Sequence, residues 1–137
     1  MPNRSKSPFI ARGNQRYIVI NTGTQNIDNG SGTTVDAVVL AGLLADAYII
    51  DAHPVYTEAT DTAGVASANW KLGVSAGGAT IVAATALQVS KAIGAAGASV
   101  PGLVPLLKGQ TLFWRHTGIA ATEAGAYFLQ ITLMLMP

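Results

Sequence analysis

Residues 108–137 read KGQTLFWRHTGIAATEAGAYFLQITLMLMP and contain the most regular pattern in the chain. Leucine or isoleucine occupies every second position of residues 129–135, with Gln130 and Thr132 between them. A period of two is typical of a β-strand that packs one face against a core. Residues 111–116 form a second apolar run, separated from the first by a loop that a glycine bounds. We therefore predict two neighbouring strands, antiparallel to each other, at the end of the chain.

Upstream of this pair, further short segments have the composition of strands separated by turns. They are residues 16–21, 35–40, 43–52, 70–75, 80–85 and 100–107. Between two of them, Gly77 and Gly78 give the strongest hairpin signal, because glycines readily adopt the positive φ angles of a tight turn. Pro101 and Pro105 place their segment at a sheet edge, since proline donates no hydrogen bond to a ladder. The pattern predicts an all-β fold of about eight strands, a sandwich or a barrel.

The composition limits the class of protein. The chain has 137 residues, enough for one domain with a core. Hydrophobic residues make up 50% and charged residues 11%, whereas an ordinary soluble domain has roughly 25% charged residues. Because the chain has so few charged residues, electrostatic repulsion between copies is weak. We therefore expect partners to cover much of the surface. The absence of cysteine excludes disulfides, zinc–thiolate sites and a thiol nucleophile.

The charge is distributed unevenly along the chain. The net charge is only +1, which excludes a globally basic nucleic-acid binder, yet the first sixteen residues contain four bases and no acid. No apolar run of a signal peptide follows this basic segment. The most apolar window, residues 35–50, carries Asp36 and Asp46 and is too short to span a bilayer. We therefore expect no membrane and no nucleic acid as a partner.

Residues 1–14 lack any periodicity and are interpreted as an extended basic arm, followed by a β domain over residues 15–137. A solvated, disordered terminus is one reading of the arm. Another is an arm that becomes ordered against a neighbouring subunit, with Phe9 and Ile10 as its apolar anchor. A third is an arm that reaches for nucleic acid, although four charges give weak, salt-sensitive binding.

The titratable residues give little support for a catalytic site. Asp51 and His53 would share one face of a strand, but no G-x-S-x-G motif supplies a nucleophile. Asp51, Glu58 and Asp61 are glycosidase or calcium candidates by residue type only, because the spacing of a calcium loop is absent. His116 is predicted at the exposed end of its strand. We predict no catalytic, cofactor or metal site and no enzyme activity.

The aromatic residues fall into two groups by parity along their strands. Trp70 and Trp114 share strand faces with leucines, which predicts that both pack in the core. Phe113 and Phe128 have the opposite parity and should lie on the outer surface. Outward phenylalanines on a weakly charged sandwich form an apolar patch unless another subunit covers them. They are our candidates for self-association, and a sugar or base platform is the alternative role for exposed aromatics.

The order of segments in the second half of the chain resembles a known protein family. Residues 70–85, WKLGVSAGGATIVAAT, precede a Gly/Ala-rich link, the apolar LVPLL of 103–107, the KGQTL of 108–112 and the terminal alternating strand. This order, over residues 47–136, resembles the small jelly-roll decoration proteins of tailed bacteriophages, also called cement or head auxiliary proteins. The resemblance rests on composition and contains no catalytic motif.

The resemblance implies a jelly-roll-like antiparallel β-sandwich that forms a homotrimer on the capsid surface. Such a virion structural protein binds the major capsid protein lattice, stabilises the phage head and is made in the host bacterial cytoplasm. The residues themselves, rather than any family motif, assign the arm to capsid or neighbour contact. These arm residues are Arg4, Lys6, Phe9, Ile10 and Arg12. The alternative is a tail-fibre or receptor- or carbohydrate-binding β-module of a phage.

Overall fold

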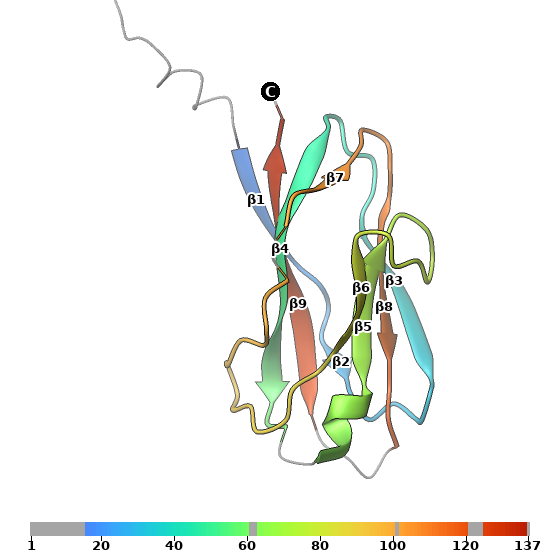
Figure 1. Ribbon diagram of the computed structural model, residues 1–137, viewed down its shortest axis with the longest axis vertical. Coiled ribbons are helices and arrows are strands. Elements are labelled where there is room, and N and C mark those ends of the chain that lie inside the picture. Colours follow the sequence, from blue (N-terminus) through green and yellow to red (C-terminus); the bar gives the residue numbers. More distant parts are fainter. Residues whose placement is uncertain (1–15, 61–62, 101, 121–124, 137) are drawn as a thin grey trace, which may run out of the picture.

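The computed structural model describes residues 16–60, 63–100, 102–120 and 125–136. Within them the chain forms nine strands and one short 3₁₀ helix, arranged as two facing sheets (Figure 1). The predicted all-β sandwich is therefore confirmed. The elements are β1 (Arg16–Asn21), β2 (Gln25–Asn26), β3 (Thr34–Leu40), β4 (Ala47–Glu58), η1 (Ala63–Ser67), β5 (Asn69–Gly73), β6 (Val82–Ala86), β7 (Val104–Leu106), β8 (Leu112–Thr117) and β9 (Ala126–Leu135).

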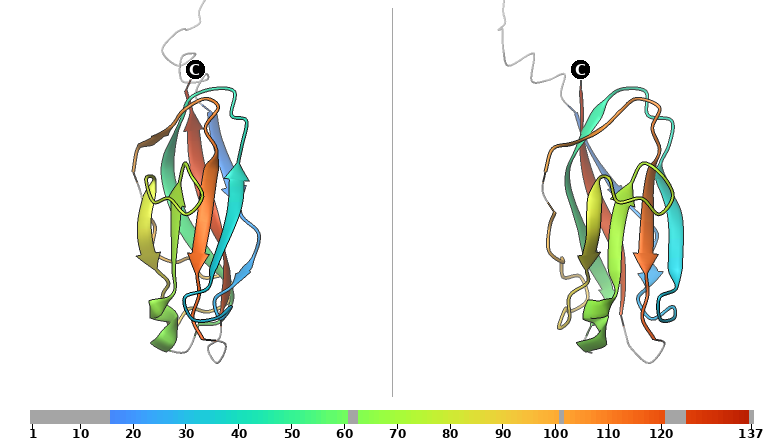
Figure 2. Two further views of the ribbon diagram at one scale, coloured as in Figure 1. Left: turned by 90° about the vertical axis from the view of Figure 1, so that its right-hand side faces the viewer. Right: turned by 45° about the vertical axis from the view of Figure 1, so that its right-hand side comes forward.

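The two sheets have a nested strand order. The first sheet runs β1-β9-β4-β7, with β2 continuing the β1 edge of β9, and the second runs β3-β8-β5-β6. Every pairing within them is antiparallel. Strands from the beginning of the chain thus pair with strands from its end, while β5 and β6 in the middle pair with each other. Figure 2 shows the two sheets facing each other along the long axis of the molecule.

The core lies between the sheets and follows the period of two. Leu129, Ile131 and Leu133 of β9 are fully buried, as the alternating pattern predicts. Trp70 and Trp114 face them from the second sheet and are at most 4% exposed, which confirms their predicted place in the core. Removing each aliphatic side chain from water contributes roughly 1.5–3 kcal/mol, so these inward positions supply most of the stabilisation.

The last two strands are not neighbours, contrary to the prediction. β8 lies between β3 and β5 in the second sheet, whereas β9 lies between β1 and β4 in the first. Each strand therefore has a partner on both edges, which gives both of them central positions. A period of two identifies the face that a strand buries but says nothing about which strand lies beside it.

β4 is longer than the segment predicted for it and continues through Pro54 to Glu58. Leu129, opposite Pro54, exchanges its hydrogen bonds with Thr22 on the far side of β9. The backbone nitrogen of Pro54 therefore points away from β9, where no ladder bond is lost. The strand accommodates its proline for this reason.

Residues 93–99, predicted as a flexible linker, run beside β4 instead, and Val100, from the predicted edge strand, continues along the same path. Ala95 accepts a hydrogen bond from the Tyr56 N–H at 3.0 Å, and Val100 donates to Ala52 at 2.8 Å. Gly97 donates to the Pro54 carbonyl at 2.7 Å, and a Cβ at Gly97 would lie 3.2 Å from the Tyr56 ring. The backbone hydrogen bonds of this irregular segment continue the pairing along the same edge of β4 that β7 occupies.

Two local predictions are confirmed. β5 and β6 form a hairpin, with Gly77 in its turn at φ +71°. β7, which contains Pro105, is the short edge strand of the first sheet.

Candidate assembly surfaces

A buried polar cluster joins β8, β9 and the loop after β2. His116, which was predicted to be exposed, is fully buried because the inward parity of β8 continues to its end. Its Nδ1 lies 2.7 Å from the Tyr127 hydroxyl and its Nε2 lies 3.2 Å from Asn29 Oδ1. The Asn29 amide nitrogen faces the Thr33 carbonyl, so Oδ1 is the atom toward the imidazole. Nε2 therefore carries the proton, and the Tyr127 hydroxyl donates to Nδ1.

Burial controls the protonation of this cluster. It lowers the pKa of His116 from 6.5 to about 4, so the imidazole is neutral near pH 7. It also raises the pKa of the Tyr127 hydroxyl well above its usual value of 10.0. Gly118 belongs to the same site, because a Cβ there would collide with Asn29 Oδ1. The cluster therefore forms a buried polar contact between β8, β9 and the loop after β2.

Asp51 and His53 share the outer face of β4, as their spacing predicts. His53 Nδ1 lies 2.8 Å from Asp51 Oδ2, and their side chains are 16% and 28% exposed respectively. Glu58 accepts a hydrogen bond from the Gly125 N–H at 2.9 Å, while Asp61 lies outside the described residues. Among the residues that the structure describes, there is no cleft and no cluster of three potential metal ligands.

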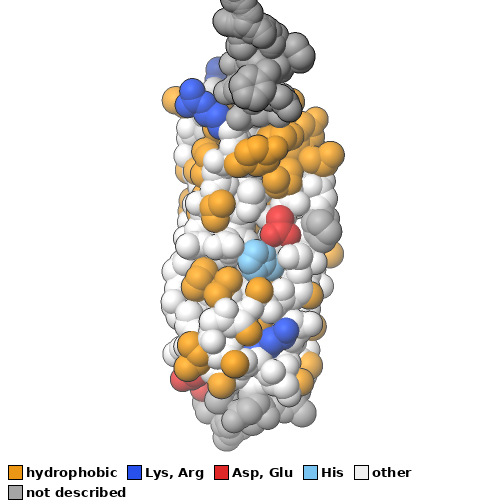
Figure 3. Space-filling view, turned by 90° about the vertical axis from the view of Figure 1, so that its left-hand side faces the viewer, with side chains coloured by type: hydrophobic (Ala, Val, Ile, Leu, Met, Phe, Trp, Pro, Cys, Tyr) orange, Lys and Arg blue, Asp and Glu red, His pale blue; other side chains and the backbone are white. Residues whose placement is uncertain are grey.

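The outer face of the first sheet carries a row of large apolar side chains, which we call the outer row. Tyr17, Met134, Tyr48 and Pro105 lie in register across β1, β9, β4 and β7. Tyr17 is 61% exposed, and Figure 3 shows hydrophobic side chains gathered at the upper end of this face. The sequence alone did not reveal the row, because its four members align only once the strand register is known.

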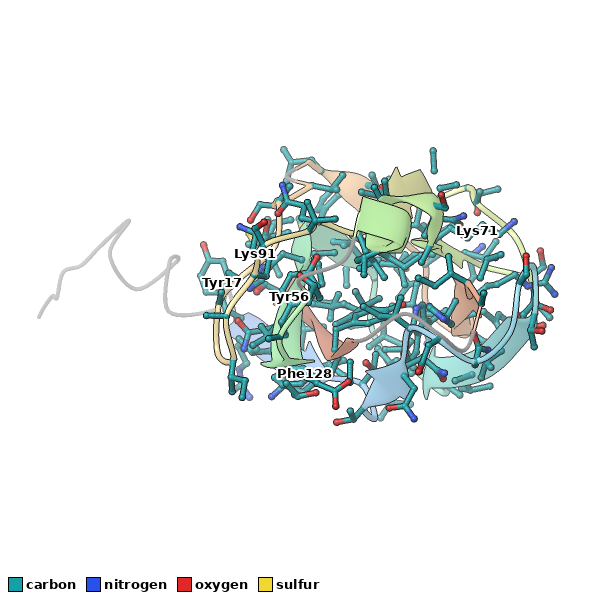
Figure 4. The ribbon with its side chains drawn as sticks, turned by 90° about the horizontal axis from the view of Figure 1, so that it is seen from below. Tyr17, Tyr56, Lys71, Lys91 and Phe128 are labelled. Atoms are coloured by element: carbon teal, nitrogen blue, oxygen red, sulfur yellow. The ribbon has the colours of Figure 1, made fainter. Side chains whose placement is uncertain are left out.

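Phe113 and Phe128, the predicted self-association residues, are half-buried on opposite outer faces. Phe113 lies between Val38 and Gly73 on the second sheet, and Phe128 lies opposite Val55 on the first. The two sheet faces point in opposite directions, as Tyr17 and Lys71 illustrate in the view along the strands (Figure 4). The structure therefore does not bring the two phenylalanines into one patch.

The outer face of the second sheet also carries the strongest ion pair among the described residues. Arg115 binds Asp36 through two hydrogen bonds of 2.6 Å, and these bonds lower the pKa of Asp36. The Gly77 turn lies against the guanidinium, since a Cβ at Gly77 would be 2.6 Å from its central carbon. The ion pair therefore packs against the turn of the β5–β6 hairpin.

The predicted arm contacts cannot be placed on either face. Arg4, Lys6, Phe9, Ile10 and Arg12 all lie outside the described residues, which begin at Arg16. Within the part of the chain that is described, no helix is both long enough and apolar enough to cross a membrane.

Comparison with known proteins gives one informative likeness. No protein-family model matches the chain, and no curated protein sequence matches it. A solved structure, the cyanophage Pam1 capsid asymmetric unit, contains a chain that superposes with a TM-score of 0.59 at 16% sequence identity. The likeness covers 100% of this chain and 93% of that one. The two chains share a fold. At this identity the likeness establishes the fold and nothing further.

Proposed function

We propose that this protein is a structural component of a bacteriophage virion, a decoration or cement protein on the capsid surface. The observation that carries the proposal is the likeness over the whole chain to a chain of a phage capsid asymmetric unit. The order of segments in residues 47–136 supports the same family independently of that likeness. In this role the protein binds the major capsid protein and stabilises the head.

We further propose that the sandwich is a jelly roll. Its nested pairing supports this topology: β1 and β2 pair with β9, β3 with β8, β4 with β7, and β5 with β6. One long antiparallel hairpin, rolled up so that its paired strands alternate between two sheets, gives this order.

In the proposed role the protein acts by binding its partners through apolar surface, and it catalyses no reaction. Tyr17, Val38 and Leu103 are 61%, 58% and 67% exposed, so large apolar side chains are available at the surface for contact with a partner. Many copies act together on one closed shell, so each contact can be weak while the sum stabilises the head.

The proposed homotrimer uses the two phenylalanine faces in a head-to-tail contact. A ring of three copies needs a heterologous interface, in which one surface patch meets a different patch of the next copy. Phe113 and Phe128 lie on different faces, as a heterologous contact requires, and the ring closes at three when this contact rotates each copy by a third of a turn relative to the last. The arm residues Arg4, Lys6, Phe9, Ile10 and Arg12 are then available for the capsid lattice.

Sedimentation with capsid shells tests the proposal. The protein is mixed with shells of the major capsid protein of its own phage, which is synthesised with it in the host cytoplasm. We expect full-length protein to sediment with the shells and to raise the temperature at which they break open. Deleting residues 1–14 should weaken this binding at least tenfold while the circular dichroism of the β domain stays unchanged. Loss of folding on this deletion would refute the assignment of the arm.

A tail-fibre or receptor-binding module is the second candidate, and the two tyrosines of the outer row, exposed Tyr17 and half-buried Tyr48, favour it. Tyr17 and Tyr48 could stack against a sugar ring, as aromatic side chains do in carbohydrate sites. Antibody labelling of intact virions separates the two functions. Label on the tail, together with glycan binding and no affinity for shells, would replace the decoration assignment.

A further inference from the structure

We propose that the free edge of β1 pairs antiparallel with β1 of a second copy of this chain. The pairing would join the first sheets of two molecules into one continuous sheet across a two-fold axis. It adds a second contact to the proposed trimer but does not depend on the virion assignment.

β1 differs from the other edge strands in the part of the chain that is described. β7 has three residues and contains Pro105, while β3 carries Asp36 and a register shift. β6 also has a shifted register against β5. β1 pairs with β9 over six residues without a shift or a proline, and its single charge, Arg16, lies at its first position. A regular edge without these protections is a template for pairing with another chain.

Both faces of β1 carry exposed apolar side chains. Tyr17 and Val19, on the outer face, are 61% and 57% exposed. Ile18 points to the inner face, opposite the fully buried Leu133, and is nevertheless 38% exposed. Within the described residues, the second sheet therefore leaves this end of β1 partly uncovered. A strand that is apolar on both faces and unpaired at one edge is expected to be covered in the assembled protein.

The hydrogen-bond pattern identifies the groups at the free edge. Thr22 donates its N–H to the Leu129 carbonyl at 2.9 Å, and the Leu129 N–H donates to Thr22 Oγ1 at 2.8 Å. In an antiparallel ladder every second residue points its N–H and C=O to the same side. Counting back from Thr22, the free edge therefore presents the backbone groups of Tyr17, Val19 and Asn21.

One register pairs all of these groups. With the two-fold axis at Val19, each Val19 lies opposite its copy, Tyr17 lies opposite Asn21, and Ile18 lies opposite Ile20. Each residue that points to the free edge then donates one hydrogen bond and accepts one. The axis is perpendicular to the sheet, so outer side chains remain on the outer face and inner ones on the inner face.

The side chains in this register are compatible. The central valines are β-branched, a type that packs well across strands, and Ile18 meets the equally apolar Ile20. The two Arg16 residues lie at opposite ends of the paired strands, and residues 16–21 contain no other charge. No like charges oppose each other, which favours a second copy over a charged partner strand.

Val19→Lys tests the contact directly. Val19 is 57% exposed in the single molecule, so a lysine there is tolerated by the fold. In the proposed pair it places two ammonium groups opposite each other at the centre of the interface. We expect the mass of the assembly, measured by light scattering, to fall to half that of the wild type. The matched variant Val19→Thr keeps a β-branched side chain without charge and should retain the wild-type mass.

A proline pair locates the effect on the backbone. Val19→Pro removes an N–H of the free edge without affecting the ladder to β9, so it should also halve the mass and leave the melting temperature nearly unchanged. Ile18→Pro removes an N–H that points to β9 and should lower the melting temperature instead. This difference shows whether the variants act on association or on folding.

Three results would overturn the pairing. They are a wild-type monomer, an equal mass for the wild type and Val19→Lys, and a wild-type mass that is halved by deletion of residues 1–14 but not by Val19→Lys. The last would make the arm the occupant of the edge. The trimer is judged separately, because a Val19→Lys mass of three times 14.0 kDa supports it whatever happens at β1.

Discussion

At the scale of single residues, His116 links the pH to the stability of the fold. Its folded-state pKa is about 4, against 6.5 without burial. As the pH falls through 6.5 the unfolded chain binds a proton that the folded chain does not, so the free energy of unfolding decreases. We expect a loss of roughly 2 kcal/mol between about pH 7 and pH 5, measured by urea unfolding.

His116→Gln provides the control for this prediction. Glutamine hydrogen-bonds in the same space and does not titrate, so the free energy of unfolding of the variant should change much less over the same pH range. All other titratable residues are the same in the two proteins. An identical decline in the variant would show that another group causes the pH dependence.

The sequence could not have placed His116 correctly from its neighbours alone. Its neighbour Arg115 is charged, and the run of strand residues ends at Thr117, which together favour an exposed strand end. The parity of Leu112 and Trp114, continued by one more step, does point His116 inward. Its polar partners Asn29 and Tyr127 come from distant parts of the chain, and only the fold brings them to the imidazole.

At the scale of elements, the segment beside β4 makes the most specific prediction. Gly97→Ala places a Cβ against the Pro54 and Tyr56 rings, so it should lower the free energy of unfolding by roughly 1–3 kcal/mol. Gly102→Ala is the matched control, because its Cβ meets only Val104 at an ordinary 3.8 Å. That variant should be neutral or slightly stabilising, since alanine restricts the unfolded chain. Equal thermal unfolding of both variants would contradict the described path of residues 94–100.

The same segment shows where sequence patterns stop being informative. The bounds of β1, the β5–β6 hairpin and the inward faces of β8 and β9 follow from alternation and turn residues. Strand partners do not, because β8 and β9 have similar patterns and lie in different sheets. Residues 94–100 and Gly102 pair with β4 through backbone groups, which leave no trace in side-chain composition.

At the scale of the whole molecule, the positions of Phe113 and Phe128 determine how copies can assemble. In a head-to-tail ring each joint uses the Phe113 face of one copy and the Phe128 face of the next. Phe113→Ser or Phe128→Ser alone therefore damages every joint. We expect each variant to lower the assembly mass, measured in the Val19→Lys background so that the β1 contact does not contribute.

Mixing the two variants distinguishes this arrangement from a symmetric contact. A Phe113→Ser copy keeps its Phe128 face, and a Phe128→Ser copy keeps its Phe113 face, so one intact joint forms between them. The mixture should contain a dimer of one copy of each variant that neither variant forms alone, detectable by native mass spectrometry. The ring cannot close, because the remaining faces of this dimer are both damaged. If the Phe113 face instead contacts its own copy, only Phe113→Ser will dissociate the assembly, and mixing will restore nothing.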